Sequence, residues 1–308
     1  MTVGWVAATA RGRSLLSGLI GDDGAHRLGS SRTWPDARAR LSTTFYGADL
    51  PATADRSTAR ETARRSVMWQ LRVLASWLPP ANGRLAHLAA APFEISNFER
   101  HVSRLAGRPA PEPIPLGSLG VAWPRLSTTS SADQLRRELA RSVWRDPGGT
   151  TPSAFTLGLR IAWARRVTGS IPIARSWAHG GLACLIAREL FVFGREINEA
   201  SARELDRLFG TGWREATSPP DLAQRLPTSA NWSLEGVSTG PEVWKSEVML
   251  LRRVSQDAHP LATGGAPSAA TAAAIMALML VDLWRVTASI EAAGRGSDAT
   301  EVLDAVAY

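Results

Sequence analysis

The spacing of apolar residues is the feature that most restricts the fold of this chain. Between Ser57 and Leu78, valine and leucine recur every three or four residues, and arginines occupy the other side of that pattern. This period matches the helical repeat of about 3.6 residues. Pro79 and Pro80 follow directly and end the pattern, because proline disrupts a helix interior. The segment is therefore predicted to be one long amphipathic helix.

The same helical period recurs along most of the chain, and no stretch shows the sustained alternation typical of a strand. Loops rich in proline and glycine separate the periodic segments. The sequence thus predicts an all-α protein. Further helices are expected at Phe93–Gly107, Ala154–Val167, Pro172–Glu196, Ser201–Gly210, Pro241–Val254 and Pro267–Ala293. Several tryptophans fall at apolar positions of such segments and are expected in the core, among them Trp69, Trp77 and Trp144.

The most apolar run, Ala269–Val281, is followed by Asp282. It is shorter than the stretch of about 20 residues that crosses a bilayer, so it is predicted to be part of a buried helix. Near the N-terminus, Arg11 and Arg13 stand where a secretion signal needs an apolar run, so no such signal is expected.

The composition suits a folded protein with a large core. The chain has 308 residues, of which 44% are hydrophobic and 20% charged. We expect a single elongated all-helical domain over residues 1–308. Cys184 is the only cysteine, which excludes a disulfide or a multi-thiolate metal site within the chain and fits a cytosolic protein.

The net charge of +7 raises the possibility of a nucleic-acid partner. However, every cationic residue except Lys245 is an arginine, and arginines are mixed with acidic residues along most helices. A partner with an acidic face fits the same charge. The charge alone therefore does not select nucleic acid.

The sequence contains no recognisable catalytic signature. It lacks a phosphate-binding loop, a dinucleotide-binding glycine motif, a nucleophile elbow and a His-Glu-x-x-His zinc motif. His101 lies one turn after Asn97, but a helix histidine of this kind is more often structural than catalytic. No catalytic residue, cofactor or metal site is predicted. The five histidines are scattered singly: His26, His87, His101, His179 and His259.

One short phrase occurs three times, each time with a leucine five residues before an aromatic residue. The copies end at Tyr46, Trp144 and Tyr308. Copies two and three are preceded by segments that align without gaps. This suggests three internal units at about residues 1–50, 93–146 and 281–308, although short amphipathic helices also resemble one another by chance. The aligned pairs are Glu94 with Asp282, Phe98 with Val286, and Val102 with Ile290.

Taken in order, these phrases resemble a known family. The segments are "WVAATARGRSLL" at Trp5–Leu16, "LSTTFYGADL" at Leu41–Leu50, "EISNFER" at Glu94–Arg100, and a last unit that begins at Asp282 and ends in "EVLDAVAY". The chain resembles the C subunits of the archaeal and bacterial V/A-type rotary ATPases, the counterparts of the d subunit of the eukaryotic V-ATPase. It departs from that pattern at Arg285, which stands where Asn97 stands in the second copy, and at Trp144, where a tyrosine is usual.

The resemblance implies a funnel of three similar helical units with pseudo-threefold symmetry. It also implies a non-catalytic rotor component at the cytoplasmic face of the membrane. Such a component would contact the central shaft subunits, called D and F in this family, and the membrane proteolipid ring in ATP-linked proton or sodium transport. No cofactor, nucleic acid or small-molecule substrate would be expected. Candidate interface residues are Arg11, Arg13, Arg100 and Arg104.

Two other functions remain open from the sequence. One is a basic helical nucleic-acid-binding protein, which would need arginines gathered on one face. The other is an all-α enzyme without a recognisable motif, which would need carboxylates and a histidine converging in a pocket.

Overall fold

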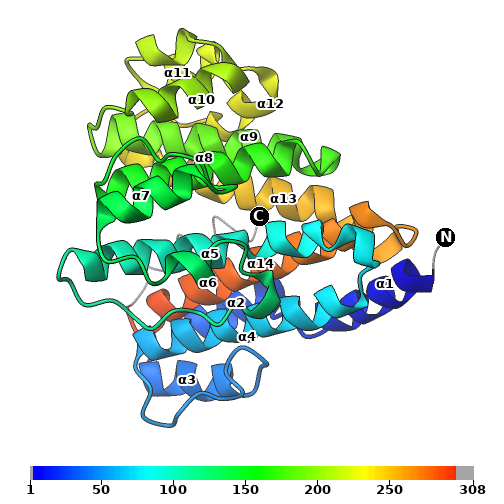
Figure 1. The fold of residues 1–308 in the computed structure, drawn as a ribbon. Helices are drawn as coiled ribbons and strands as arrows, with labels where there is room; N and C mark the ends of the chain where they lie inside the picture. Colours follow the sequence, from blue (N-terminus) through cyan, green and yellow to red (C-terminus); the bar gives the residue numbers. More distant parts are fainter. Residues whose placement is uncertain (1–2, 296–308) are drawn as a thin grey trace. The chain divides into compact units, whose positions relative to one another are not determined.

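A computed structural model describes residues 3–295, and every regular element in that range is helical (Figure 1). The prediction of an all-α protein is confirmed for this part of the chain. A π-helical turn at Arg188–Val192 extends α9, and short 3-10 turns occur in several connections. The α-helices are α1 (Val3–Leu16), α2 (Gly21–Gly29), α3 (Trp34–Ser42), α4 (Arg56–Trp77), α5 (Arg84–Leu105), α6 (Trp123–Leu126), α7 (Ala132–Ala140), α8 (Pro152–Thr168), α9 (Arg175–Ala187), α10 (Glu199–Phe209), α11 (Pro219–Arg225), α12 (Thr228–Asn231), α13 (Trp244–Gly264) and α14 (Ala269–Ala292).

Most predicted helices begin and end where the sequence signals indicated. α4 starts after Asp55, whose side chain accepts a hydrogen bond from the Thr58 N–H at 2.8 Å, and it ends just before Pro79. α13 differs, because it continues past the expected end at Val254, through Pro260, to Gly264. α5 also differs, because it begins at Arg84 and continues through Pro92. The expected start at Phe93 treated this proline as a helix boundary, whereas the helix accommodates it internally.

The chain divides into two compact units. Unit 1 comprises Met1–Ala90, Ile114–Leu119 and Leu251–Tyr308, and unit 2 comprises Ala91–Pro113 and Gly120–Leu250. The predicted internal unit at 1–50 and the described part of 281–308 fall in unit 1. Most of 93–146 falls in unit 2. The third copy of the repeated phrase, Leu303–Tyr308, lies outside the described residues.

Unit 1 is built around α14, which packs against α1, α2 and α4. By length and hydropathy α14 could cross a membrane, but 72% of its apolar window is buried in the protein. α1 approaches it closely at Gly12, where a Cβ atom would lie 2.8 Å from Ile275 Cδ1. The apolar run ending at Val281 is thus the first part of a core helix, as the sequence predicted.

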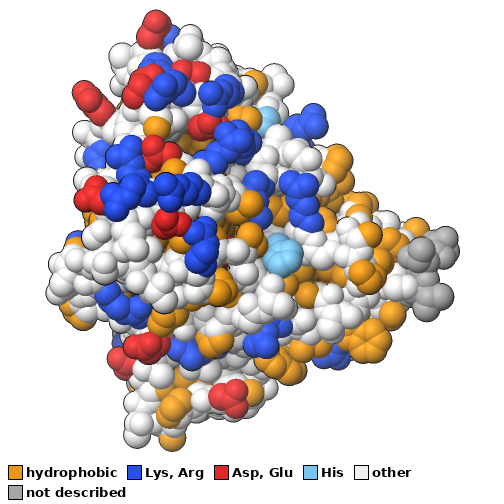
Figure 2. Space-filling model, in the orientation of Figure 1, with side chains coloured by type: hydrophobic (Ala, Val, Ile, Leu, Met, Phe, Trp, Pro, Cys, Tyr) orange, Lys and Arg blue, Asp and Glu red, His pale blue; other side chains and the backbone are white. Residues whose placement is uncertain are grey.

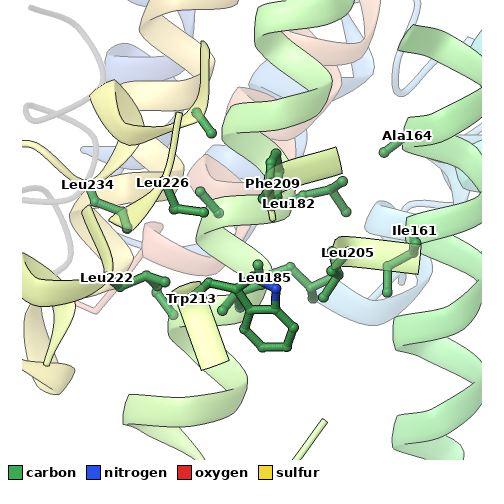
Figure 3. Packing of buried hydrophobic residues seen from close by; sticks show 14 of the residues in the cluster. Ile161, Ala164, Leu182, Leu185, Leu205, Phe209, Trp213, Leu222, Leu226 and Leu234 are labelled. Carbon is green, nitrogen blue, oxygen red and sulfur yellow. The ribbon is translucent and has the colours of Figure 1, made fainter. Parts of the chain in front are cut away.

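Unit 2 contains two hydrophobic clusters. The first joins α5, α6, α7 and α8 around Phe98, whose ring makes edge-on contacts with Trp123 at 5.5 Å and Trp144 at 6.1 Å between ring centroids. The second joins α8–α12, and Figure 3 shows Leu185, Leu205 and Trp213 within it. Edge-on aromatic pairs of this kind add to the stability gained from burial alone.

Two tryptophans expected in the core lie at the surface. Trp69 is 53% exposed and Trp77 is 49% exposed. The buried side of α4 is formed by smaller residues, including Val67, Leu71 and Leu74. The two indoles project from other sides of the helix, so the prediction is wrong for this pair and correct for Trp144, which is buried.

Candidate functional site

Two buried carboxylates each hold the start of another helix. Asp282, on α14, is fully buried. Its Oδ2 accepts a hydrogen bond from the Ile20 N–H at 3.0 Å, and its Oδ1 accepts one from the Gly21 N–H at 2.9 Å. The Tyr46 hydroxyl also donates to Oδ2. The carboxylate therefore joins the N-terminus of α2 and the first part of the loop after α3.

Glu94, on α5, has the corresponding role in unit 2. Its Oε1 alone accepts hydrogen bonds from the backbone N–H groups of Val121, Ala122 and Trp123, at 2.9, 2.6 and 2.7 Å. These groups immediately precede or begin α6. The second oxygen, Oε2, is buried and has no hydrogen-bond partner among residues 3–295.

Both carboxylates satisfy N–H groups that a helix leaves unpaired at its start. Their negative charge also lies at the positive end of the helix dipole, which favours the contact. Burial nevertheless raises the pKa of Asp282 and that of Glu94 above the usual carboxyl range, because a charged carboxylate is poorly solvated in the core. These two residues are the pair that the sequence alignment placed at equivalent positions.

The aromatic residues that end the two repeated phrases differ in their polar contacts. The Tyr46 hydroxyl donates to Asp282, whereas the Trp144 indole N–H has no hydrogen-bond partner within the described chain. Arg166 instead lies over the Trp144 ring, 5.2 Å from its centroid. Tryptophan at this position therefore keeps the packing role but not the hydrogen bond to the carboxylate.

The order of the elements along the chain differs between the two units. In unit 2, α5 carries its carboxylate and then leads into α6, α7 and Trp144. In unit 1, the corresponding helix is α14, although it packs on α2 and bonds to Tyr46, which lie more than 230 residues earlier in the sequence. The sequence unit at 1–50 and the described part of the unit at 281–308 therefore belong to a single structural unit, and α14 rather than α1 is the counterpart of α5.

A third helix, α11, starts in the same way as α3 and α7, and the sequence analysis missed it. The N-cap residues are Thr33, Ser131 and Ser218, and each hydroxyl accepts a hydrogen bond from the N–H three residues later, at 3.3, 3.2 and 3.3 Å. In each case the fourth and eighth residues after the cap are buried. These are Ala37 and Leu41, Leu135 and Leu139, and Leu222 and Leu226.

The signal for this third helix is present in the sequence. A serine or threonine cap, a carboxylate or amide three residues later, and apolar residues at the fourth and eighth positions occur in all three segments. A search for leucine followed by an aromatic residue misses it, because Asn231 stands where Tyr46 and Trp144 stand.

Three of the four predicted interface arginines contact backbone carbonyls. Arg13 donates from Nε to the Ala262 carbonyl at 2.9 Å and from Nη2 to the Gly265 carbonyl at 2.6 Å, which secures the end of α13. Arg100 donates to the Glu112 carbonyl at 2.6 Å, and Arg104 donates to the Pro111 carbonyl. These two arginines hold the loop that follows α5.

The four arginines do not form one cluster. Arg11, which is half-buried, and Arg13 lie in unit 1, whereas Arg100 and Arg104 lie in unit 2. Their role in partner binding stays a prediction, and for Arg13, Arg100 and Arg104 the structure adds an internal bracing role.

Arg285, where the sequence departs from the family pattern, also has a structural role. Its guanidinium forms an ion pair with Asp22 in the first turn of α2, with an N–O distance of 2.6 Å. It also donates to the Ser255 hydroxyl at 3.3 Å. In unit 2 the equivalent Asn97 is fully buried. The larger residue in unit 1 thus links α14 to two neighbouring segments.

Burial also shifts the pKa values of further titratable groups in the described chain, among them His101 and Cys184. His101 Nε2 lies 2.9 Å from the Thr129 hydroxyl, and burial lowers its pKa. Burial raises the pKa of the Cys184 thiol to about 11, which disfavours the nucleophilic thiolate. Residues 3–295 contain no group of three or more side chains placed to bind a metal ion. The arrangement is suited to holding helices and loops in fixed positions.

No protein-family model matches the chain, and no curated protein matches it. Inferences about its function therefore depend on the residues and contacts described above.

Proposed function

We propose that the chain is a non-catalytic coupling component of a V/A-type rotary ATPase, joining the central shaft to the membrane proteolipid ring. The main supporting observation is the matched pair of carboxylates. Asp282 and Glu94 occupy aligned positions in the two sequence copies, and each accepts backbone N–H groups at the start of another helix.

The physical requirements of a coupler agree with this arrangement. A part that transmits torque must connect its helices rigidly, and densely packed interiors deform little under load. Buried hydrogen bonds between a helix and a distant loop add specific connections to that packing. α3, α7 and α11 share a hydroxyl cap followed three residues later by a carboxylate or amide, and this shared pattern favours a chain of three related parts. A funnel with pseudo-threefold symmetry, located at the cytoplasmic face of the membrane, is part of this proposal.

The nucleic-acid alternative receives less support. A nucleic-acid-binding surface needs arginines that are free to contact phosphates. In unit 2, many exposed arginines instead pair with carboxylates. For example, the single carboxylate of Glu204 forms ion pairs with Arg145, Arg165 and Arg207. The enzyme alternative would require a convergent acid–base site, and the buried carboxylates described here are engaged with backbone groups.

The test is recovery of the tagged chain from its native membranes in mild detergent, with the bound proteins identified by mass. The D and F proteins of the shaft and the proteolipid are expected to be recovered together with it. Direct binding of the purified chain to a purified shaft complex should then be measurable at micromolar concentration. The proposal fails if the folded chain does not bind the shaft complex at that concentration.

A single variant tests the predicted interface. Arg11→Gln is expected to weaken shaft binding without changing the thermal unfolding of the chain. Arg40→Gln, an exposed arginine on α3, is the matched control and should bind like the wild type. Equal binding by both variants would remove Arg11 from the interface.

A further inference from the structure

One end of unit 1 has basic and aromatic residues but no acidic ones. Neither α1 nor the stretch from Thr62 to Phe93 contains aspartate or glutamate. The start of α1 lies beside the end of α4, because a Cβ atom on Gly4 would be 3.2 Å from Pro79 Cγ. We call this region, formed by residues 4–7 of α1, residues 62–80 and Arg84, the acid-free end. Its arginines are Arg64, Arg65, Arg72 and Arg84.

The acid-free end exposes large apolar side chains from two neighbouring helices. Trp69 and Trp77 on α4 are each about half exposed, and Val6 on α1 is 48% exposed. Arg65, Trp69, Arg72 and Ser76 follow one another at intervals of four, three and four residues. They therefore form one line along the outer side of α4, with arginines above and below an indole.

The positive charge of this line is not neutralised within the described part of the chain. Neither Arg65 nor Arg72 forms an ion pair with any residue in 3–295, in contrast to the paired arginines around Glu204. In the space-filling view, hydrophobic side chains gather around the N-terminal end of α1, and no acidic side chain is visible there (Figure 2). On the same view, acidic and basic side chains intermingle over α7, α8 and α10.

We propose that the acid-free end docks on the surface of a membrane that contains anionic phospholipids. Indole rings favour the boundary between headgroups and acyl chains, where the ring is buried and its N–H remains hydrated. Arginine pairs well with phosphate, and a negative membrane surface attracts basic segments that lie close to it. Trp69 and Trp77 are the anchors, and Arg65 and Arg72 contact the headgroups.

The spacing of the anchors favours lipid over a folded protein partner. Trp69 and Trp77 are separated along the helix axis by about 12 Å, with Arg72 between them. A protein partner would need separate pockets for the two indoles and carboxylates in positions that match the arginines. A fluid headgroup layer adjusts to separated side chains without such matching.

The experiment is flotation of the full chain with vesicles of phosphatidylcholine alone or of equal parts phosphatidylcholine and phosphatidylglycerol. Binding is expected only to the anionic vesicles, and it should weaken as salt is added. Each of Arg65→Gln and Arg72→Gln should lower the partition constant about fivefold. The double variant Trp69→Gln/Trp77→Gln should abolish measurable binding.

Matched controls lie in unit 2, outside the acid-free end. Trp244→Gln changes another exposed tryptophan, and Arg141→Gln changes another exposed arginine. Both should float like the wild type. Circular dichroism melting checks that every variant is folded. If the tryptophan variant is unstable, the arginine variants, which change surface charge alone, still decide the test.

Several results would overturn the proposal. The first is that the chain does not bind anionic vesicles. The second is that the unit 2 control variants lose as much vesicle binding as the variants of the acid-free end. The third is that the chain binds a single-stranded oligonucleotide or an acidic peptide as tightly as the vesicles, through the same residues. The vesicles contain no protein, so this outcome is independent of the rotary-coupler proposal. The chain can bind vesicles without binding the shaft complex, and it can bind the shaft complex without binding vesicles.

Discussion

At the scale of single residues, Asp282 and Glu94 both accept backbone N–H groups at the start of a helix, but they use different numbers of carboxylate oxygens. Asp282 uses both carboxylate oxygens, one for the Gly21 N–H and the other for the Ile20 N–H and the Tyr46 hydroxyl. Glu94 uses only Oε1, which accepts all three of its hydrogen bonds. The two sites should therefore respond differently when one oxygen is replaced by an amide nitrogen.

We predict that Asp282→Asn destabilises the protein more than Glu94→Gln does. Asparagine would turn a donor NH₂ group toward a backbone N–H or the Tyr46 hydroxyl, at a cost of about 2 kcal/mol in the free energy of unfolding. Glutamine can keep its oxygen on all three donors and place its NH₂ where Oε2 has no partner. Its cost should stay below about 1 kcal/mol.

Urea unfolding of both variants measures this difference. Asp282→Ala and Glu94→Ala are the reference pair, because each leaves backbone N–H groups unsatisfied, and both should be clearly destabilised. Equal effects of the two amide variants would contradict the assignment of the hydrogen bonds to one oxygen in Glu94 and to two in Asp282.

The pH dependence of stability gives a second prediction for Asp282. Because burial raises its pKa, the folded protein holds this proton more tightly than the unfolded chain does. Its contribution to stability is thus fully present below the ordinary carboxyl pKa and declines as the pH rises through the raised value. The stability advantage of wild type over Asp282→Asn should narrow as the pH rises above about 4, the ordinary pKa of an aspartate.

Urea unfolding at a series of pH values tests this sign. Asparagine does not titrate, so the difference between the two proteins isolates the aspartate. If the advantage instead grows with pH, the three hydrogen bonds to the ionised form outweigh the effect of burial, and the pKa of Asp282 lies below its usual value.

At the scale of elements, periodicity located α4, α5, α8, α9, α10, α13 and α14, but not short helices such as α2, α6, α11 and α12. α4 and α14 begin at capping residues and carry continuous apolar sides, so local sequence determines them. The start of α5 was not predictable in this way, because surrounding structure decides whether Pro92 breaks the helix. The exposure of Trp69 and Trp77 was also missed, since residue type does not reveal which side of a helix has a neighbour.

The candidate site was only partly predictable from the sequence. The alignment of Glu94 with Asp282 identified the two carboxylates as equivalent, although their partners Val121 and Ile20 lie in loops without a periodic signal. The contacts of Arg13 and Arg100 with backbone carbonyls depend on long-range folding, which local patterns do not report.

Two adjacent glycines in α9 give a matched test of helix packing. A Cβ atom on Gly180 would lie 2.5 Å from Cζ2 of Trp232, whose indole is held by a hydrogen bond to the Ser229 carbonyl. Next to it, a Cβ atom on Gly181 would meet only Leu250 Cδ2, at 3.6 Å. The two positions share a helix but differ in the space available.

We expect Gly180→Ala to lower the free energy of unfolding by about 1–3 kcal/mol, because the new methyl group forces the indole to move. Gly181→Ala should raise it by about 0.5–1 kcal/mol, since alanine favours the helix over glycine. Chemical unfolding of both variants is the measurement. Effects of the same sign would show that helix propensity rather than the contact with Trp232 dominates at Gly180.

At the scale of the whole molecule, the two units differ in which parts of the sequence form them. Both hydrophobic clusters of unit 2 are formed by residues between Ala91 and Val243. Unit 1 instead combines residues from the two ends of the chain, with α14 packed against α1, α2 and α4. One unit is nearly continuous in sequence, and the other is not.

This difference predicts the behaviour of fragments. A fragment of residues 84–250 should be helical and unfold cooperatively, because it contains both clusters of unit 2. A fragment of residues 1–90 should lack cooperative unfolding, since it has no α14 against which to bury its helices. Circular dichroism during urea titration distinguishes the two. A cooperative transition in the 1–90 fragment would contradict the central role of α14.

The hydrogen bond from Tyr46 to Asp282 joins positions that are 236 residues apart. During synthesis the ribosome needs on the order of 10–50 s to translate that distance. Tyr46 therefore leaves the ribosome well before the helix that completes its surroundings. Until α14 is released, α1, α2 and α4 expose their apolar sides to the surrounding solution, and in this period the nascent protein depends most on chaperones.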